Sequence, residues 1–209
     1  MCTYKPRRHV VPAFILLFFC LGAISKAFAL EVLAPQSKAD YGSGASAANL
    51  YYPGGIPGMG LFLGQPNTGS RNDRALVRFG IAPHLLSGSP VDSATLSFRI
   101  SAFCAPEDAH EIEITHLSYD ANSFSVNDML NARSEIVGIV SVKRKDLDPK
   151  DTNKEYSIDV TQYVNADIGR GNLYSAFRFK DVTAETKDRG TATSIYAVCI
   201  KNLPQLKIR

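Results

Sequence analysis

Histidines and acids that could bind a metal or move protons come together in one short stretch, "HEIEITH", from His110 to His116. If this stretch is a strand, Glu111 and Glu113 share one face and both histidines lie on the other, because side chains alternate along a strand. Metal ligation would then need residues from another segment. We expect surface or rim histidines here. No GxSxG, HExxH or phosphate-binding-loop motif occurs in the chain, so the sequence predicts no enzyme.

Oxygen ligands that suit calcium occur in residues 36–75, a stretch rich in Gly, Ser, Asn and Pro that is typical of loops and short strands. Calcium prefers carboxylate and amide oxygens. The spacing of an EF-hand is absent, so calcium is a hypothesis that rests on residue type alone. The candidate ligands are Asp40, Asn67, Asn72 and Asp73.

Aromatic and cationic side chains suggest a sugar site, because carbohydrate sites combine aromatic platforms with planar polar groups. Arginine can also bind a carboxylate through two parallel hydrogen bonds, which favours an acidic sugar such as a uronate. The alternative is that Tyr and Phe fill the core and that the arginines decorate exposed strand faces. The candidate ligand-binding residues are Tyr41, Tyr51, Tyr52, Arg78, Arg99 and Arg178.

The first 29 residues have the layout of a secretory signal peptide. Lys5, Arg7 and Arg8 precede an apolar run of fifteen residues, which is shorter than the about 20 residues that span a bilayer, and Ala27-Phe28-Ala29 is a small-x-small cleavage pattern. We therefore expect cleavage after Ala29, no stable membrane span in the mature chain, and a secreted protein of the extracellular space, cell surface or periplasm.

Removal of this leader changes the charge of the protein. The leader holds Lys5, Arg7, Arg8 and Lys26, and their removal from the 23 basic residues leaves 19 against 20 acidic residues, a net charge of −1. Overall charge therefore gives no reason to expect a nucleic acid partner.

Two cysteines remain in the mature chain, Cys104 and Cys199. Export to an oxidising compartment favours a disulfide between them, which in the chain-entropy model would stabilise the fold by about 4 to 5 kcal/mol. The alternative is two buried thiols. Neither cysteine has CxxC spacing, so a zinc site is not expected.

Alternation of apolar and polar residues with a period of two recurs from Ala75 to the C-terminus, with turn signals between the segments. This pattern predicts an all-β fold, an antiparallel two-layer β-sandwich or a barrel, in a single domain over residues 30–209. Short strands are expected around Asn49–Tyr52 and Gly60–Leu63. The residues expected in the core include Phe98, Ile100, Ile112, Ile114, Ile158, Val160 and Phe177.

One or two short helices are expected to interrupt the strands. "SVNDMLNARS" contains a good N-cap at Ser125. "DVTQYVNADIGRG" is expected to begin at Asp159 or Thr161 and to stop at Gly169, whose missing Cβ permits a left-handed cap.

The order of several phrases resembles that of DNRLRE-type domains, which are extracellular β-sandwich modules of jelly-roll type. The phrases are "RALVRFGI", "VDSATLSFRI", "YSIDVTQYVN…GNLYSAFRFK" and the closing "LPQLKIR". The resemblance covers about Leu33 to Arg209. It implies a relation to carbohydrate-binding modules that occur beside alginate lyases and other polysaccharide enzymes.

Together these features predict a secreted, non-catalytic module that binds an extracellular polysaccharide, an acidic one if the arginines take part. The alternative is a structural or adhesive component of a cell surface, envelope or extracellular matrix, which would bind surface proteins or other copies of itself through sheet edges or exposed patches.

Overall fold

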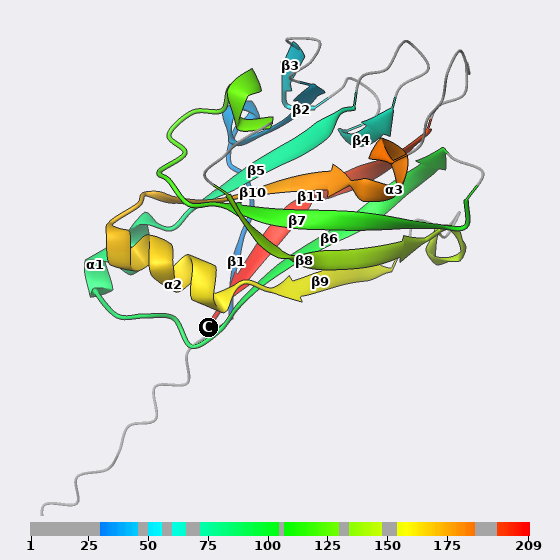
Figure 1. Ribbon diagram of the computed structural model, residues 1–209. Helices are drawn as coiled ribbons and strands as arrows, with labels where there is room; N and C mark the ends of the chain where they lie inside the picture. Colours follow the sequence, from blue (N-terminus) through cyan, green and yellow to red (C-terminus); the bar gives the residue numbers. More distant parts are fainter. Residues whose placement is uncertain are drawn as a thin grey trace, which may run out of the picture.

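The computed structural model confirms an all-β sandwich of two antiparallel sheets (Figure 1). It describes residues 30–45, 50–55, 60–65, 72–104, 107–129, 134–147, 154–186 and 196–209. The expected signal peptide, residues 1–29, lies outside these ranges, so its cleavage stays a prediction. No helix within the described ranges is long and apolar enough to cross a membrane.

One sheet has five strands, in the order β1-β11-β6-β9, with β4 paired to the first half of β11. Its longest strands, β6 and β11, pair along most of their length. The expected short strand near Gly60–Leu63 is confirmed as β4. The bounds are β1 Glu31–Leu33, β4 Leu61–Gln65, β6 Ala94–Cys104, β9 Glu155–Asp159 and β11 Tyr196–Ile208.

The other sheet has six strands, in the order β3-β2-β5-β10-β7-β8. Its central neighbours β5, β10 and β7 are far apart in the sequence, so the chain crosses repeatedly between the two sheets. The expected short strand near Asn49–Tyr52 is confirmed as β3. The bounds are β2 Tyr41–Ala45, β3 Leu50–Pro53, β5 Arg74–Gly80, β7 Ala109–Leu117, β8 Ser134–Lys143 and β10 Tyr174–Asp181.

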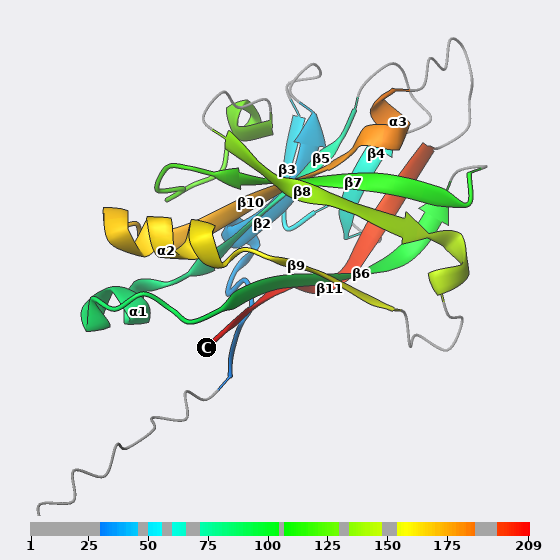
Figure 2. The same ribbon diagram turned by 60° about the horizontal axis from the view of Figure 1, so that its bottom comes forward.

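The described residues contain three short α-helices, one more than expected: α1 Ala82–Ser87, α2 Thr161–Arg170 and α3 Val182–Glu185. α1 and α2 lie together at one end of the sandwich (Figures 1 and 2). Single 3-10 turns occur at Lys38–Asp40, Val126–Met129 and Arg144–Asp146. The helix expected from Ser125 is thus only one 3-10 turn in the part that the structure describes.

Helix α2 begins at Thr161, one of the two expected starts, where the Asp159 carboxylate accepts hydrogen bonds from the Thr161 amide and hydroxyl. Its expected end at Gly169 is wrong. Gly169 lies inside the helix, and the left-handed cap is Gly171, with φ of 76°, whose amide donates to carbonyls of the last turn. Gly169 and Gly171 are both able to adopt the left-handed conformation, and the length of the helix decides that Gly171 does so.

The main core fills the space between the sheets. Six of the seven residues expected there are buried, and Ile158 is half-buried against the same core. Phe98 packs face to face with Tyr156 and edge to face with Phe179, arrangements that aromatic rings prefer. The apolar alternation along the strands therefore identified this layer correctly.

A second, smaller apolar cluster lies on the outer side of the six-stranded sheet. Leu76, Leu117 and Ala176 of the sheet contact Ala121 and Met129 from the segment after β7, and Tyr51, Tyr119 and Phe124 pack around them. Strands β5, β10 and β7 are therefore covered on both faces, although their sequences alternate as if one face were open to water.

Candidate functional site

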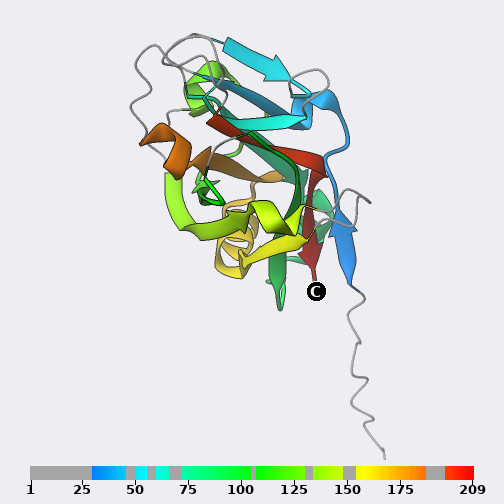
Figure 3. The ribbon, with the colours of Figure 1, turned by 90° about the vertical axis from the view of Figure 1, so that its right-hand side faces the viewer.

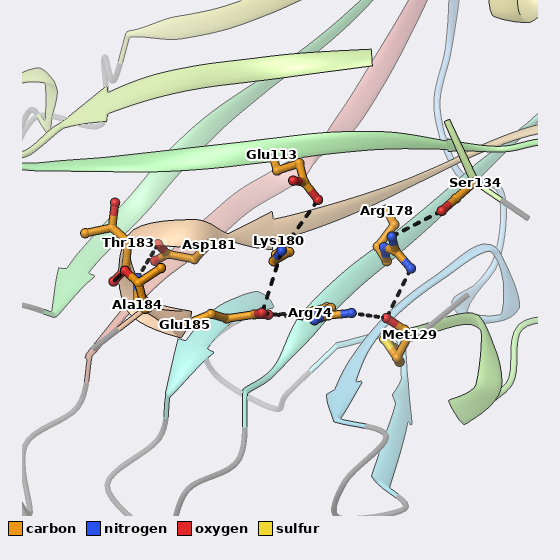
Figure 4. A network of polar contacts seen from close by, with 11 residues as sticks. Arg74, Glu113, Met129, Ser134, Arg178, Lys180, Asp181, Thr183, Ala184 and Glu185 are labelled. Carbon is orange, nitrogen blue, oxygen red and sulfur yellow. Dashed lines mark hydrogen bonds and ion pairs between the residues drawn. The ribbon is translucent and has the colours of Figure 1, made fainter. Parts of the chain in front are cut away.

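The outer side of the six-stranded sheet carries a network of charges (Figure 4). Arg74 of β5 binds Glu185 of α3 through two hydrogen bonds of 2.8 and 2.9 Å, and donates to the Met129 carbonyl at 2.6 Å. Lys180 of β10 lies between Glu185, at 3.9 Å, and Glu113 of β7, at 3.8 Å. The network fastens α3 and the Val126–Met129 turn to the sheet.

The position of Glu185 in this network depends on Asp181, which caps α3. One Asp181 oxygen accepts from the Ala184 amide at 2.9 Å, and the other lies 2.5 Å from Nδ1 of His110. Both Asp181 and His110 are fully buried. A buried pair between β10 and β7 thus holds the helix start that presents Glu185 to Arg74.

Arg178, a predicted ligand residue, is buried beside this network. It donates to the Met129 carbonyl at 3.2 Å and to the Ser134 hydroxyl at 3.4 Å, and its Nε has no hydrogen-bond partner among the described residues. Burial, and then the charge of Arg74, lower the pKa of Arg178 from its ordinary value. With 6% of its surface exposed, Arg178 connects Met129 and Ser134 to β10.

Arg78, another predicted ligand residue, is also 6% exposed. Its guanidinium binds Asp40 at 2.8 Å, donates to the Ala121 carbonyl at 2.6 Å, and lies 4.2 Å from the centre of the Tyr174 ring. Asp40 was predicted as a calcium ligand. The structure instead joins the two candidates to each other in an internal ion pair.

The carboxylate of Asp40 is held in its ionised form. Burial on its own would raise its pKa, but hydrogen bonds from Arg78 and Ser37 outweigh this effect and hold the pKa below its ordinary value. The same carboxylate forms a capping box with Ser37 at the start of the Lys38–Asp40 turn. Asp40 therefore fixes the N-terminal segment against β5.

The three predicted tyrosines do not form a platform. The Tyr51 ring lies over Gly42, where a Cβ atom would come within 2.6 Å of it, and burial raises the Tyr51 pKa to about 12. Tyr41 packs against the main core. Tyr52 follows Tyr51 on β3 and therefore faces the opposite side of that strand. Gly42 is thus required by the ring of Tyr51.

Asn72 and Asp73 are the other predicted calcium ligands that the structure describes. Asp73 is buried, and its backbone pairs with that of Gly64; Asn72 is half-buried, and Asn67 lies outside the described residues. The described ranges contain no group of three or more His, Cys, Asp or Glu side chains that could hold a metal.

The prediction of rim histidines is wrong for His110 and His116, which are buried. They do share one strand face, as the alternation required, but that face is the core. The His116 ring lies 2.8 Å from Asp167 of α2, and the Ser175 hydroxyl donates to the same carboxylate at 2.7 Å. Because the hydroxyl bonds to the acid and not to the imidazole, this trio is not an activated nucleophile.

The two cysteines lie on neighbouring strands of the five-stranded sheet. Cys104 of β6 stands opposite Ala197, and Cys199 of β11 stands opposite Ala102, so the two are diagonal neighbours. Diagonal Cα atoms are about 7 to 8 Å apart in such sheets, beyond the usual disulfide range. No disulfide occurs among the described side chains, and that of Cys104 is outside them. The pairing stays a prediction.

Arg99, the remaining predicted ligand residue, has a different environment. It lies on β6 with its side chain on the outer side of the five-stranded sheet, opposite Glu155 of β9. In Figure 2 no described helix lies across β6, β9 and β11. The neighbouring outward positions are also polar, with Ser97 opposite both Ser157 and Gln205.

A hollow of about 240 Å³ opens beside Arg99. It forms where β11 leaves its register with β6: Lys201 pairs with Arg99, but the next pair is Gln205 with Ser97, so residues 202–204 of β11 stand opposite Phe98 alone, two more than regular pairing allows. Pro204 is one of these residues, and it has no amide hydrogen for the ladder. The residues that line this Arg99 hollow are Ser97, Phe98, Arg99, Glu155, Leu203 and Gln205.

Glu155 organises the charges of the Arg99 hollow. It accepts a hydrogen bond from Lys207 and lies 3.5 Å from the Arg99 guanidinium. The hydrogen bond from Lys207 is the main reason why the pKa of Glu155 lies below its ordinary value. The side chains of Arg99 and Glu155 are 43% and 33% exposed. Both groups can therefore reach a ligand from solvent, while Ser97 forms part of the buried floor.

Sequence reasoning identified Arg99 but missed the rest of the hollow. Ser97, Glu155 and Gln205 come from three strands, and no motif connects them. No protein-family model matches this chain, and no curated protein matches it. The resemblance to DNRLRE-type domains therefore stays a prediction.

Proposed function

We propose that this protein is a secreted, non-catalytic module that binds an extracellular polysaccharide, with one sugar residue in the Arg99 hollow. One observation carries the proposal: a concave, polar and solvent-open site exists on the outer face of the five-stranded sheet, over which no described helix lies. Its volume lies below the about 300–1,000 Å³ of pockets for drug-sized ligands, which suits a single sugar ring and not a long segment of a chain.

The lining groups fit sugar hydroxyls and a sugar carboxylate. Arg99 offers several donors, Glu155 offers acceptors, and Gln205 and Ser97 offer both. Two cations, Arg99 and Lys207, face the one carboxylate of Glu155, so the local charge is positive. We therefore infer a preference for an acidic sugar, whose carboxylate would bind Arg99.

A binding role fits this site better than hydrolysis. Glycosidic cleavage uses a pair of carboxyl groups on either side of the bond, and among the described residues that line the hollow Glu155 supplies the only one. The open site also excludes little water. Affinity is expected to be modest and to fall with added salt, because exposed charge pairs are screened.

The test is a glycan array on the mature protein, followed by calorimetry with the best ligand. Arg99→Ala is expected to weaken binding about tenfold, as loss of one charge-assisted contact does. Arg170→Ala is the matched control, since Arg170 is an arginine of similar exposure on α2. Unchanged affinity in Arg99→Ala, or no binding to any neutral or acidic glycan, would refute the proposal.

The structural or adhesive alternative is supported by a separate observation, the exposed isoleucines of β8. That observation concerns the opposite sheet and does not involve the Arg99 hollow.

A further inference from the structure

Lys207 of β11 is bound to the Arg99 hollow without lining it. Its ammonium group donates to Oε1 of Glu155, whereas Oε2 of the same carboxylate lies 3.5 Å from the Arg99 guanidinium. Each cation therefore takes one oxygen of a single carboxylate. The contact with Arg99 is at the long limit of a hydrogen bond, so Lys207 is the stronger partner of Glu155.

The strand registers show how Lys207 reaches Glu155. β6 lies between β11 and β9 in the sheet. Figure 3 shows the end of β11 that carries Lys207, in red beside the C label, next to β1 in blue. Lys207 pairs with Thr95 of β6, and Glu155 pairs with Arg99, which is further along the same strand. The Lys207 side chain therefore crosses the outer face of β6 past the level of Ser97, the buried floor of the hollow, and draws the Glu155 side chain toward β11.

We propose that Lys207 sets the charge preference of the Arg99 hollow: by holding Glu155, it leaves the Arg99 guanidinium available to the carboxylate of an acidic sugar. This inference rests on the proposed function of the hollow. When the sugar binds, Arg99 exchanges a long contact with Glu155 for a direct one with the sugar, and Lys207 still balances the charge of Glu155. Lys207 is thus a positioning residue, which acts through Glu155 and does not touch the sugar.

Without Lys207 the same carboxylate would oppose the ligand. Of the cations that the structure places beside Glu155, Arg99 would be the one left, and opposite charges at this distance attract. A sugar carboxylate would then compete with Glu155 for Arg99 and would be repelled by it at close range. Glu155 is the group that would reject acidic sugars, and Lys207 is the group that prevents this rejection.

Neutral sugars provide the contrast. They carry no charge for Glu155 to repel, and their hydroxyls can bond to Glu155, Gln205 and Ser97, which offer acceptors or donors. Their affinity should therefore depend less on Lys207. The effect of Lys207 on acidic sugars should fall with added salt, because the charged groups concerned are partly exposed and salt screens such charges.

The first experiment needs no sugar. NMR titration of the Glu155 carboxyl group in the full mature chain measures its pKa, which lies below the ordinary value of 4.5 with the hydrogen bond from Lys207 as the first cause. Lys207→Met is expected to raise this pKa toward 4.5. Lys154→Met is the matched control, because it removes an ammonium group 3.5 Å from a different carboxylate, that of Asp146. An unchanged pKa in Lys207→Met would overturn the proposal, whether or not the hollow binds sugar.

The second experiment compares two probes that differ in charge: an oligosaccharide of glucuronic acid, and the same oligosaccharide with its carboxyl groups reduced to alcohols. Calorimetry is expected to show that Lys207→Met weakens binding of the acidic probe about fivefold more than binding of the neutral probe. Lys207→Arg keeps the positive charge and is expected to retain most of the affinity for the acidic probe. Equal losses for both probes would mean that Lys207 only supports the shape of the hollow, and would overturn the proposal.

Glu155→Gln separates action through Glu155 from direct contact. It removes the repelling charge, so the acidic probe is expected to bind more tightly than to the native protein, and Lys207→Met added to it is expected to have no further effect. A loss of about fivefold that persists in the double variant would mean that Lys207 itself contacts the sugar, and the proposal would be wrong. If neither probe binds the native protein, the proposed function fails and this inference with it. If Arg99→Ala weakens binding of the acidic probe and Lys207→Met does not, this inference alone fails.

Discussion

The outer faces of the two sheets differ in what covers them, and this difference decides what their arginines do. On the six-stranded sheet, the segment after β7 and helix α3 cover the centre, and Arg78 and Arg178 are buried beneath them. On the five-stranded sheet no described helix lies over β6, and Arg99 is 43% exposed. Strands with similar alternation therefore carry buried arginines on the six-stranded sheet and a solvent-exposed arginine on the five-stranded sheet.

The two buried arginines also differ from each other. Arg78 has a carboxylate partner, Asp40, and an aromatic ring beside it. Arg178 has a carbonyl and a hydroxyl as partners and a like charge, Arg74, nearby. A buried charge is costly to desolvate unless it is paired, so we expect these two residues to contribute unequally to stability.

The largest effect is expected when the buried pair is broken. Asp40→Ala leaves the Arg78 charge buried without its carboxylate and is expected to lower the free energy of unfolding by about 3 to 5 kcal/mol. Denaturant unfolding measures this change, with Lys38→Ala in the same turn as the control. A loss below about 1 kcal/mol would show that the covered face tolerates an unpaired charge.

A smaller loss is expected for Arg178→Met. The variant removes two hydrogen bonds to neutral groups, but it also removes a desolvated charge that has no carboxylate partner within the described residues. These effects partly cancel, so we expect a loss of about 1 to 2 kcal/mol. A loss as large as that of Asp40→Ala would remove the distinction between the two arginines.

Acid is expected to weaken the covered face through Asp40. Its folded-state pKa lies below the ordinary value of 3.8, so its contribution is fully present above about pH 4 and is lost as the pH falls through the lower, folded-state value. Urea unfolding at several pH values between 2 and 6 should show this loss. Asp40→Asn should make the profile flatter in that window, and an equally steep profile would assign the effect to other carboxylates.

The smallest effect on stability is expected at Arg99, on the outer face of the five-stranded sheet. Arg99→Ala removes an exposed side chain whose contact with Glu155 is 3.5 Å long, and exposed pairs contribute little. The unfolding free energy should change by less than about 0.5 kcal/mol, measured beside Asp40→Ala. A larger loss would mean that Arg99 supports the fold, and reduced glycan binding in that variant would no longer identify a contact.

The pattern of the sequence determined the layers of this protein well. Period-two alternation predicted the strands and the residues between the sheets, from Phe98 to Phe177, because the direction of side chains along a strand is a local property. The start of α2 was predicted at Asp159 or Thr161, and the helix begins at Thr161, because the signals that start a helix lie in adjacent residues. Adjacent residues did not decide whether Gly169 or Gly171 ends the helix, because either glycine can adopt the left-handed conformation.

Only the tertiary structure decided which polar residues are internal. His110 meets Asp181, and Arg78 meets Asp40, across 71 and 38 residues of sequence. The Arg99 hollow needs the register shift between β6 and β11. An arginine or histidine on a strand has the same local pattern whether its face is bare or covered. Burial depends on which distant segment folds over it, and that contact is a property of the assembled chain and not of the strand.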